Sequence, residues 1–294
     1  TEPSELLIAD VTVSTAIACF GDNETIKVNV TQGSTAPYIY SVSGSATETS
    51  DATTATTYSF SVPVGTYTVK VTDANGCEKS LDPITLTQSA AALAVSGVVK
   101  PYIGGFQVSC NGASDGEIDT TVTGGTIGSG YTYAWSVTGG GTDISASTSA
   151  DQLDLKAGTY TVVVTDANGC DQTDSYTLTQ PDALSLDSSQ VDFNGFNVSC
   201  FGALNGEIDL TVTGGTPVYT YEWSSSDGTG YDPTSQDQTD LSSGTYIVKV
   251  TDSNNCEISG TFVVAEPPPL VLTATLSDFN GFNISCNAGN DGII

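Results

Sequence analysis

Residues 158–170 read GTYTVVVTDANGC, and this stretch indicates the fold more clearly than any other. Its alternate residues Tyr160, Val162 and Val164 are apolar, as in a strand with one buried face. The DANG that follows predicts a tight turn, because Asn-Gly is the commonest short hairpin signal. The same unit returns as GTYTVKVTDANGC at residues 65–77 and GTYIVKVTDSNNC at residues 244–256. Self-similarity of this kind predicts tandem domains.

A second block recurs in step with the first. CFGDNETIKVNVTQG begins at Cys19, CNGASDGEIDTTVTGG at Cys110, CFGALNGEIDLTVTGG at Cys200 and CNAGNDGII at Cys286, so the period is about 90 residues. The fourth copy stops inside its first expected core strand, and we expect the natural protein to continue. The predicted units are repeat 1 at 1–89, repeat 2 at 90–181, repeat 3 at 182–267, and the start of a truncated repeat 4 at 268–294.

Within one repeat, short alternating segments predict strands with turn signals about every ten residues. In repeat 2, Tyr131, Tyr133 and Trp135 share a face, and the same pattern recurs in repeat 3, whereas repeat 1 has Val42 in the Trp position. The L-x-x-G-x-Y pattern that ends at Tyr160 resembles a tyrosine corner. We therefore predict an all-β chain of tandem immunoglobulin-like β-sandwich repeats, each with seven or so strands, in an elongated array.

The amino-acid composition argues against several classes of function. Six Lys, no Arg and 34 acidic residues give a net charge of −28, which repels phosphates and argues against nucleic acid or an anionic membrane surface as a partner. The absence of His removes the usual general base and the commonest metal ligand. No apolar run is long enough to insert in a membrane, and the first residues look like those of a mature or internal segment. We expect no enzyme activity and no cofactor.

The motifs C-x-G-x-x-D/N-G-x-I, VTGGT, YxYxW, AGTYTVxVTDANGC and TLTQP occur in fixed order. In this order they resemble the SprB repeat of giant cell-surface adhesins in gliding bacteria of the Bacteroidetes group. The resemblance implies an extracellular filament that is exported by type IX secretion, moved along the cell surface by a motor, and attached to the substratum. Repeat 1 departs from the pattern, with QGS in place of GGT and SVPVG in place of the L-x-x-G turn.

Seven cysteines, one near the start and one near the end of each complete repeat, suit an oxidising compartment. Without His or a CxxC pair, a zinc site is not expected. Disulfides within each repeat are one interpretation. However, in an immunoglobulin-like topology the strand after the first cysteine runs parallel to the strand before the second, which separates the two by about 30 Å. Bonds between neighbouring repeats and free thiols therefore stay open as alternatives. The pairs within repeats would be Cys19 with Cys77, Cys110 with Cys170 and Cys200 with Cys256, leaving Cys286; the pairs between repeats would be Cys19 with Cys170 and Cys110 with Cys256.

Three further groups of residues are candidate sites. The oxygen-rich turns could hold calcium, although Asp and Asn suffice to build such turns; they contain Asp73, Asn75, Asp166, Asn168, Asp252 and Asn254. The DFNGF inserts could form an aromatic platform for sugars or cover a sheet edge; their aromatic residues are Phe193, Phe196, Phe279 and Phe282. Thr120 lies in a short Asp-Thr-Thr pattern that the resemblance associates with O-glycosylation, whereas an outward strand Thr is the plain interpretation.

The leading hypothesis is a non-enzymatic, extracellular adhesin segment, attached to the bacterial cell surface, that makes many weak contacts with an external surface or polysaccharide. Neighbouring repeats of the same chain are its other expected partners. The alternative is a set of carbohydrate-binding accessory repeats from a secreted polysaccharide-degrading enzyme. An enzyme within these residues is a third hypothesis, and it would need a carboxylate pair in a cleft.

Overall fold

The structure is a computed structural model and describes residues 7–13, 16–32 and 35–292. Its regular elements are β-strands and one short 3-10 turn, η1 (Ile103–Gly105). The chain divides into two compact units. The first comprises Thr1–Pro101, Phe106–Val108 and Gly112–Gln180, and the second comprises Tyr102–Gly105, Ser109–Asn111 and Pro181–Ile294.

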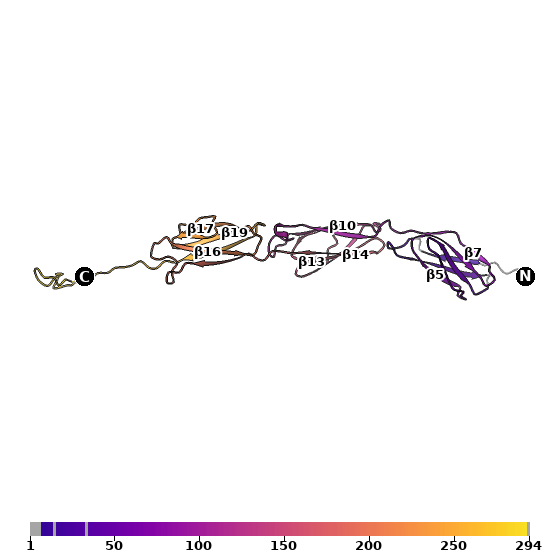
Figure 1. Cartoon of the computed structure of the whole chain (residues 1–294), viewed down its shortest axis with the longest axis horizontal. Coiled ribbons are helices and arrows are strands. Elements are labelled where there is room, and N and C mark those ends of the chain that lie inside the picture. Colours follow the sequence, from indigo (N-terminus) through magenta and orange to yellow (C-terminus); the bar gives the residue numbers. More distant parts are fainter. Residues whose placement is uncertain (1–6, 14–15, 33–34, 293–294) are drawn as a thin grey trace. The chain divides into compact units, whose positions relative to one another are not determined.

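The sandwich of repeat 2 has two antiparallel sheets, in the orders β12-β10-β9 and β11-β13-β14 (Figure 1). The β11-β13-β14 sheet holds its strands in a continuous register, for example Tyr160 opposite Tyr176, whereas the pairing of β10 with β12 shifts register between Gly116 and Ile118. Within the described residues this repeat therefore has six paired strands. The bounds are β9 (Ala94–Val99), β10 (Gly116–Thr123), β11 (Thr132–Thr138), β12 (Gln152–Leu155), β13 (Gly158–Thr165) and β14 (Asp171–Leu178).

Repeat 3 has the same two sheets, β15-β16-β18 and β17-β19-β20. Its strands are β15 (Ser185–Gln190), β16 (Gly206–Thr213), β17 (Thr220–Ser225), β18 (Gln238–Leu241), β19 (Gly244–Thr251) and β20 (Glu257–Val264). Repeat 1 pairs β1-β2-β5 in one sheet and β4-β3-β6-β7 in the other, where β8 also pairs with β6. Its strands are β1 (Leu7–Thr12), β2 (Glu24–Gln32), β3 (Ile39–Gly44), β4 (Glu48–Thr49), β5 (Thr57–Val62), β6 (Gly65–Thr72), β7 (Glu78–Ser80) and β8 (Ile84–Leu86).

The chain is thus all-β and built of tandem immunoglobulin-like sandwiches, as predicted. The expected seven or so strands fall to six paired strands in the described parts of repeats 2 and 3. The missing strand would lie between β11 and β12. That connection contains three consecutive glycines from Gly139 to Gly141, and Gly139 and Gly140 adopt positive φ, which favours a loop over a ladder.

The alternating residues form the cores. Trp135 and Trp223 are each 3 % exposed, and their Nε1 atoms donate to the carbonyl oxygens of Ser149 and Ser235. Burial of an indole with its N–H satisfied is the favourable case for tryptophan in a core. Repeat 1 replaces the indole with an aromatic cluster in which the rings of Tyr40 and Tyr58 stack at 5.4 Å and Tyr58 tilts against Phe60.

All three repeats have the tyrosine corner. The hydroxyl of Tyr160 donates to the carbonyl oxygen of Lys156, four residues back, at 2.8 Å. Tyr246 makes the same bond to Ser242. Tyr67 makes it to Pro63, although repeat 1 lacks the L-x-x-G sequence. The corner therefore depends on the backbone at the turn rather than on the leucine.

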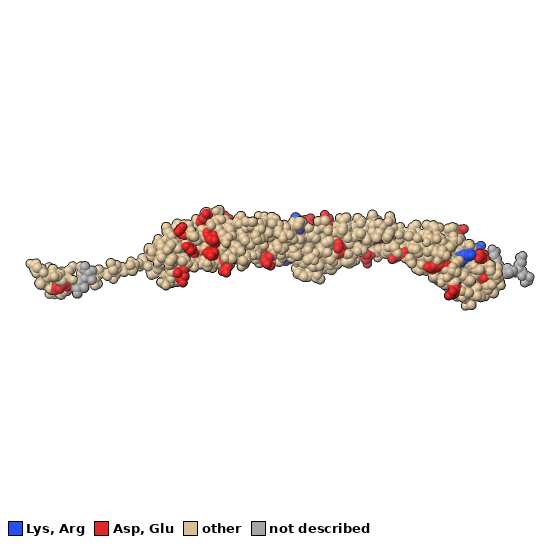
Figure 2. All heavy atoms as spheres, viewed as in Figure 1, with Lys and Arg blue, Asp and Glu red and all other residues tan. Residues whose placement is uncertain are grey.

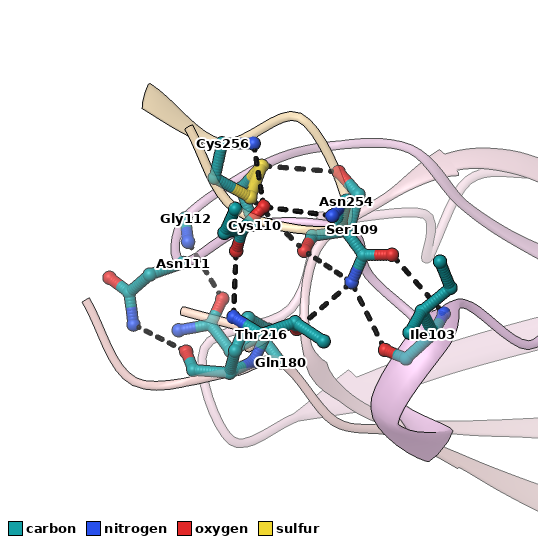
Figure 3. The surroundings of a disulfide bond; sticks show 11 residues. Ile103, Ser109, Cys110, Asn111, Gly112, Gln180, Thr216, Asn254 and Cys256 are labelled. Carbon is teal, nitrogen blue, oxygen red and sulfur yellow. Dashed lines mark hydrogen bonds between the residues drawn. A yellow bond between two sulfur atoms is a disulfide. The ribbon is translucent and has the colours of Figure 1, made fainter. Parts of the chain in front are cut away.

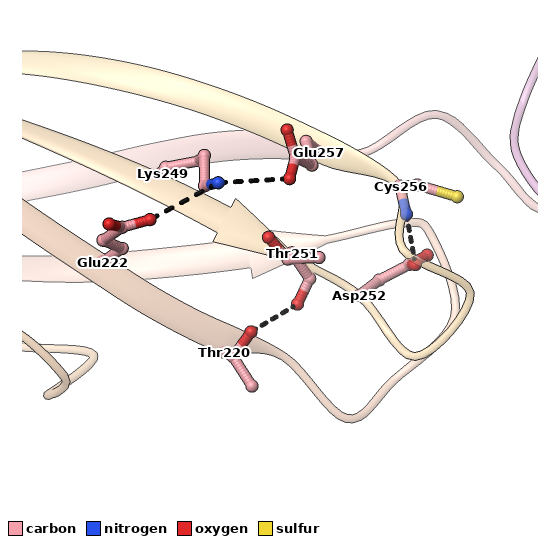
Figure 4. A network of polar contacts seen from close by, with 7 residues as sticks. All are labelled: Thr220, Glu222, Lys249, Thr251, Asp252, Cys256 and Glu257. Atoms are coloured by element: carbon pink, nitrogen blue, oxygen red, sulfur yellow. Dashed lines mark hydrogen bonds and ion pairs between the residues drawn. The ribbon is translucent and has the colours of Figure 1, made fainter.

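Acidic side chains are scattered over the face seen in Figure 2, among far fewer basic ones. Lys249 on β19 lies between Glu222 and Glu257, at 3.4 and 3.2 Å (Figure 4). The partners raise the pKa of Lys249, first through the hydrogen bonds to Glu257 and Glu222. Exposed ion pairs of this kind contribute little to folding stability, because solvent screens them. Among the described residues, no helix has the length and apolar character needed to cross a membrane.

Candidate functional site: the Asp-Asn-Cys turn and the leader tripeptide

The turn between β19 and β20, residues 252–256, is called here the Asp-Asn-Cys turn. The carboxylate of Asp252 organises it. Its Oδ1 accepts hydrogen bonds from the backbone N–H groups of Asn254 and Cys256 at 2.8 and 2.9 Å; Figure 4 shows the bond from Cys256. Its Oδ2 accepts from Thr216 N–H at 2.7 Å. Asn255 occupies the positive-φ position, which Asn tolerates better than most residues. Asp252 is 5 % exposed, so a buried carboxylate is held entirely by backbone donors.

The turns at residues 73–77 and 166–170 share this geometry. Asp166 accepts from the N–H groups of Asn168, Cys170 and Thr126 at 2.8 to 3.0 Å. Burial alone would raise the pKa of the Asp166 carboxyl, but these backbone hydrogen bonds outweigh it and hold the pKa below its usual value. The pKa of Asp73 is also lowered, first by the backbone hydrogen bond from Cys77. Both carboxylates therefore stabilise their turns in the ionised form.

A second element, here called the leader tripeptide, precedes the first core strand of each repeat and ends in cysteine. It reads Ile-Ala-Cys at 17–19, Val-Ser-Cys at 108–110 and 198–200, and Ile-Ser-Cys at 284–286. In the three complete repeats its first residue is buried in the core of its own sandwich, with Val108 and Val198 fully buried. Two residues after the cysteine, Gly112 N–H donates to Gln180 Oε1 at 2.8 Å, which explains the Gln of TLTQ. Gly112 adopts a positive φ of 76°, which explains the glycine of the C-x-G motif.

The leader tripeptide and the Asp-Asn-Cys turn meet in two disulfides among the described residues. Cys19 bonds with Cys170 inside the first unit, and Cys110 bonds with Cys256 inside the second (Figure 3). Each bond joins the leader of one sequence repeat to the turn of the next. The disulfides within repeats that the sequence allowed are therefore wrong for these four cysteines. The physical reason is the distance expected from the sequence. A leader and the turn of its own repeat flank parallel strands at opposite ends, so their cysteines are too far apart to bond.

In the two bonded turns, the asparagine side chain donates to a backbone carbonyl of the leader. Asn254 Nδ2 donates to the carbonyl oxygens of Ile103 and Ser109 at 3.1 and 3.3 Å, while its Oδ1 accepts from Ile103 N–H at 3.2 Å (Figure 3). In the first unit, Asn168 Nδ2 donates to Ala18 O at 3.0 Å. Sulfur lies close to the same carbonyls, with Cys256 Sγ 3.3 Å from Ser109 O. Because backbone atoms make these contacts, the leader side chain can be Ala or Ser.

The remaining cysteines are free. Cys77 is partly exposed in the turn of repeat 1, Cys200 is exposed in the leader of repeat 3, and Cys286 is exposed in the leader at 284–286. All seven cysteines thus occupy either a leader or a turn, and four of them are bonded.

The aromatic inserts form tight turns. Phe193 and Phe196 exchange backbone hydrogen bonds, with Asn194 at positive φ and both rings half-buried. Phe279 and Phe282 repeat this arrangement with the rings exposed, Phe282 to 71 %. Ile103 occupies the position in repeat 2 that corresponds to Phe193, and its backbone is what Asn254 contacts. In repeat 2, therefore, the segment that corresponds to the insert is part of the surface that meets an Asp-Asn-Cys turn.

Two other sequence hypotheses fit the structure poorly. Thr120 is 9 % exposed and its hydroxyl donates to Ala150 O at 2.8 Å, so in the folded chain this hydroxyl is not presented for O-glycosylation. It lies on the same buried face of β10 as Ile118, rather than pointing outward. The calcium hypothesis gains no support, because the turn carboxylates already accept backbone donors and the asparagines are used as described. Within the described residues, no group of three or more Cys, Asp or Glu is arranged to hold a metal.

The sequence analysis missed Ile103, Ser109 and Thr216 as members of the site. A signal was available only for Thr216, because the threonine of VTGGT recurs as Thr126 and Thr216. Repeat 1 has QGS in place of GGT, and the next residue, Thr35, contacts the turn asparagine there. In each repeat this threonine's hydroxyl accepts a hydrogen bond from the turn asparagine's Nδ2, at 3.0 to 3.3 Å. Ile103 and Ser109 contribute backbone atoms, and backbone contacts do not require a particular residue type, so the sequence could not indicate them.

Several solved structures are similar to this chain over much of its length. A C-terminal 282-residue fragment of intimin, solved with the intimin-binding domain of the translocated intimin receptor, shares 14 % identity over 62 % of this chain and 67 % of that one, with a TM-score of 0.38. The eight N-terminal Ig domains of Down Syndrome Cell Adhesion Molecule share 13 % identity over 89 % and 36 %, with a TM-score of 0.41. The insect immune protein hemolin shares 14 % identity over 89 % and 76 %, with a TM-score of 0.29. Likeness at this level carries no argument about binding, and no curated protein matches the chain significantly.

One protein-family model matches the sequence of this chain. The family model of the SprB repeat matches residues 107–140 and 196–228. Each match begins at or just before a leader tripeptide and extends past the first core strand and the YxYxW strand, β10 and β11 in one case and β16 and β17 in the other. It supports a cell-surface, adhesin-type repeat segment. The chain therefore contains SprB-type repeats, at these two places.

Proposed function

We propose that this chain is a non-enzymatic segment of an extracellular adhesin filament, in which consecutive repeats form a covalently reinforced stalk. The observation that carries the proposal is the register of the disulfides, each of which joins the leader of one repeat to the Asp-Asn-Cys turn of the next. A bond within a repeat would stabilise that repeat alone. A bond to the next repeat keeps neighbours joined even when a sandwich unfolds, which is the property that a protein under tension needs.

The repeats in this proposal have the predicted boundaries, 1–89, 90–181 and 182–267, followed by the start of a fourth at 268–294. Their surface supports attachment by many weak contacts, because the same strands and acidic positions recur every 90 residues or so. The net charge of −28 keeps such filaments from associating non-specifically. The partners would be an external surface or polysaccharide, with no nucleic acid, no membrane insertion and no cofactor.

The SprB match extends the proposal to gliding motility. By that similarity, the full protein would be exported by type IX secretion to the bacterial cell surface and moved there by a cell-envelope motor. These roles need parts of the protein other than the repeats, so the repeats themselves would supply reach and grip.

The proposal is tested by retention under flow. Arrays of one, three and six repeats are immobilised on beads at equal mass and detached from glass and from polysaccharide films by rising shear, with soluble sugars as competitors. If many weak contacts hold the protein, one repeat detaches easily and retention rises steeply with repeat number. The matched control is the six-repeat array with its disulfides reduced, which keeps the surface chemistry and loses the covalent links.

The competing carbohydrate-binding function predicts a different pattern. A lectin-type pocket in one repeat would give saturable affinity for a defined sugar with a single repeat. Retention that is independent of repeat number and is inhibited by one sugar would contradict the adhesin proposal. Turnover of a glycan by the purified array would contradict both.

A further inference from the structure

We propose that the outer face of the β11-β13-β14 sheet in repeat 2 binds a neutral polysaccharide. The inference rests on the proposed adhesive function and assigns it a surface and a class of partner. The strand register arranges the outward residues of this sheet in four rows of three, one residue from each strand, and most of them carry a hydroxyl. This surface is called here the hydroxyl grid. Its rows are Thr132, Thr165 and Asp171; Ala134, Val163 and Thr173; Ser136, Thr161 and Ser175; and Thr138, Thr159 and Thr177.

The hydroxyls of the grid are accessible and held in place. The grid residues on β11 and β14 are exposed, and those on the central strand β13 are partly exposed. Thr161 and Ser175 share a hydrogen bond between their hydroxyls at 2.8 Å, and Thr159 and Thr177 share one at 3.2 Å. Each hydroxyl can both donate and accept. The grid therefore offers an ordered set of hydrogen-bonding groups, about 4.8 Å apart between strands and about 6.8 Å apart along a strand.

The grid is almost free of charge, unlike the same face of the other two repeats. Lys70 in repeat 1 and Lys249 in repeat 3 occupy the position of Val163, and both form ion pairs with glutamates on neighbouring strands. Among the twelve grid residues, Asp171 at one edge is the one charged side chain. A neutral face does not attract a charged partner, and the net charge of −28 repels an anionic one. The charge distribution therefore favours an uncharged partner.

The residue types of the grid suit a sugar chain better than a protein. They are Thr, Ser, Ala, Val and Asp, with no aromatic residue and no Arg. The centres of protein interfaces are enriched in aromatic residues and Arg. A polysaccharide instead presents hydroxyls at intervals of the size of a sugar ring, and the short side chains of the grid allow it to approach closely. Without an aromatic pocket each contact should be weak, which agrees with attachment by many weak contacts.

A hollow of about 460 Å³ continues the grid beyond its last row. Thr159 and Thr177 belong to both the grid and the hollow, and Lys156 and Gln180 line the hollow as well. In the described part of the chain the Lys156 ammonium makes no ion pair, so its three N–H groups can donate to sugar oxygens. The Oε1 of Gln180 already accepts from Gly112 N–H, which leaves its amide nitrogen to donate. The hollow therefore adds hydrogen-bond donors at the end of the grid.

The corresponding positions of repeat 3 do not offer these donors. Asp227 takes the place of Gly140, and Glu266 takes the place of Gln180. Carboxylates accept hydrogen bonds and do not donate them when ionised. Both of these carboxylates already accept backbone N–H groups of their own repeat. Repeat 2 is therefore the repeat in which an uncharged grid and a donor-lined hollow occur together.

The test measures adsorption of the full 294-residue chain to insoluble cellulose, chitin and granular starch, three neutral polysaccharides, by its depletion from solution. Val163→Lys introduces the residue that repeats 1 and 3 have at this position, so it is compatible with the fold. It should lower the adsorption constant about tenfold, because an uncharged partner would cover an unpaired charge. The matched control Thr121→Lys adds the same charge to the exposed face of the other sheet of repeat 2 and should leave adsorption unchanged.

A second variant tests the hydroxyls without changing the charge. Thr161→Val keeps the branched side chain and removes one hydroxyl at the centre of the grid, so adsorption should fall about fivefold, as the loss of one hydrogen bond implies. Adsorption of the wild type should not change with salt, because no ion pair holds the partner.

Four results would overturn the proposal. The first is adsorption to none of the three polysaccharides, and the second is equal adsorption by Val163→Lys and the wild type. The third is stronger, salt-sensitive binding to beads of alginate, an acidic polysaccharide, which would indicate an ion pair with Lys156 instead. The fourth is a wild-type oligomer that Val163→Lys converts to a monomer in size-exclusion chromatography, which would assign the grid to pairing between copies of the chain.

The flow assay with repeat arrays separates this inference from the adhesive function. If retention rises with repeat number and is the same in arrays that carry Val163→Lys, the adhesive function stands and the grid is not its surface. If the chain adsorbs through the grid but retention does not rise with repeat number, the grid binds polysaccharide and the adhesin proposal fails.

Discussion

The interlocked disulfides should shorten the reach of the unfolded chain by a large and calculable amount. Without them, the segment from Cys19 to Cys256 is about 240 residues long and extends to roughly 800 Å. With both bonds, the shortest covalent route passes from Cys19 to Cys170, back along the chain to Cys110, and across to Cys256. Only about 60 residues then carry the load, which is roughly 200 Å. Reduction should therefore lengthen the fully unfolded molecule by roughly 600 Å.

Single-molecule force spectroscopy measures this difference directly. The chain is pulled from its two ends with the three free cysteines replaced by Ser, so that oxidised and reduced samples differ only at the two disulfides. The residues outside the segment from Cys19 to Cys256 extend equally in both samples and cancel. If the bonds instead lay within repeats, only Cys110–Cys170 could form in this variant, and reduction would lengthen the molecule by about 60 residues, or roughly 200 Å. Equal contour lengths before and after reduction would refute the disulfide register itself.

Three further predictions concern stability. Trp135→Ala and Trp223→Ala should each destabilise their sandwich by about 3 to 5 kcal/mol in chemical denaturation, from lost burial and the cavity left behind; near-neutral results would contradict the sandwich core. Tyr160→Phe should cost about 1 to 3 kcal/mol by the same measurement, because its hydroxyl bonds both Lys156 O and Thr142 N–H. The lowered pKa of Asp166 means that its ionised form favours folding, so this contribution is present above about pH 4 and is lost as pH falls through the folded pKa; the Tm of wild type should therefore fall below pH 4 more steeply than that of Asp166→Asn.

The sequence predicts the fold well because the signals are local and occur in triplicate. Alternation in the stretch from Tyr160 to Val164 shows which residues face the core, and the structure places the alternate positions Tyr160, Val162 and Val164 at 0 % exposure. The tyrosine corner is also a local pattern, four residues from donor to acceptor. The strand expected between β11 and β12 is the exception, since Gly139 to Gly141 form a loop that a count of turn signals does not separate from a strand.

The candidate site was predictable only in part. The cysteines and the Asp and Asn of the turns stand out by residue type, but their pairing depends on which repeat supplies each partner. Sequence spacing cannot distinguish Cys110 with Cys170 from Cys110 with Cys256, because both cysteines on the far side lie in equivalent turns. The geometric objection to pairing within a repeat, drawn from parallel strands, pointed to the register that the structure has.

The aspartate and the asparagine of the turn have separate roles, which explains why the residues of the turn recur while those of the leader vary. The aspartate carboxylate bonds only the turn's own backbone and the threonine N–H, so it sets the fold of the turn. The asparagine amide bonds the leader backbone, so it binds without regard to the leader's side chains. A turn of this kind can join any repeat whose leader presents a cysteine after a buried apolar anchor. Repeats could therefore diverge on their outer faces while each link is preserved, as the pairing of Ile-Ala-Cys at 17–19 and Val-Ser-Cys at 108–110 with equivalent turns illustrates.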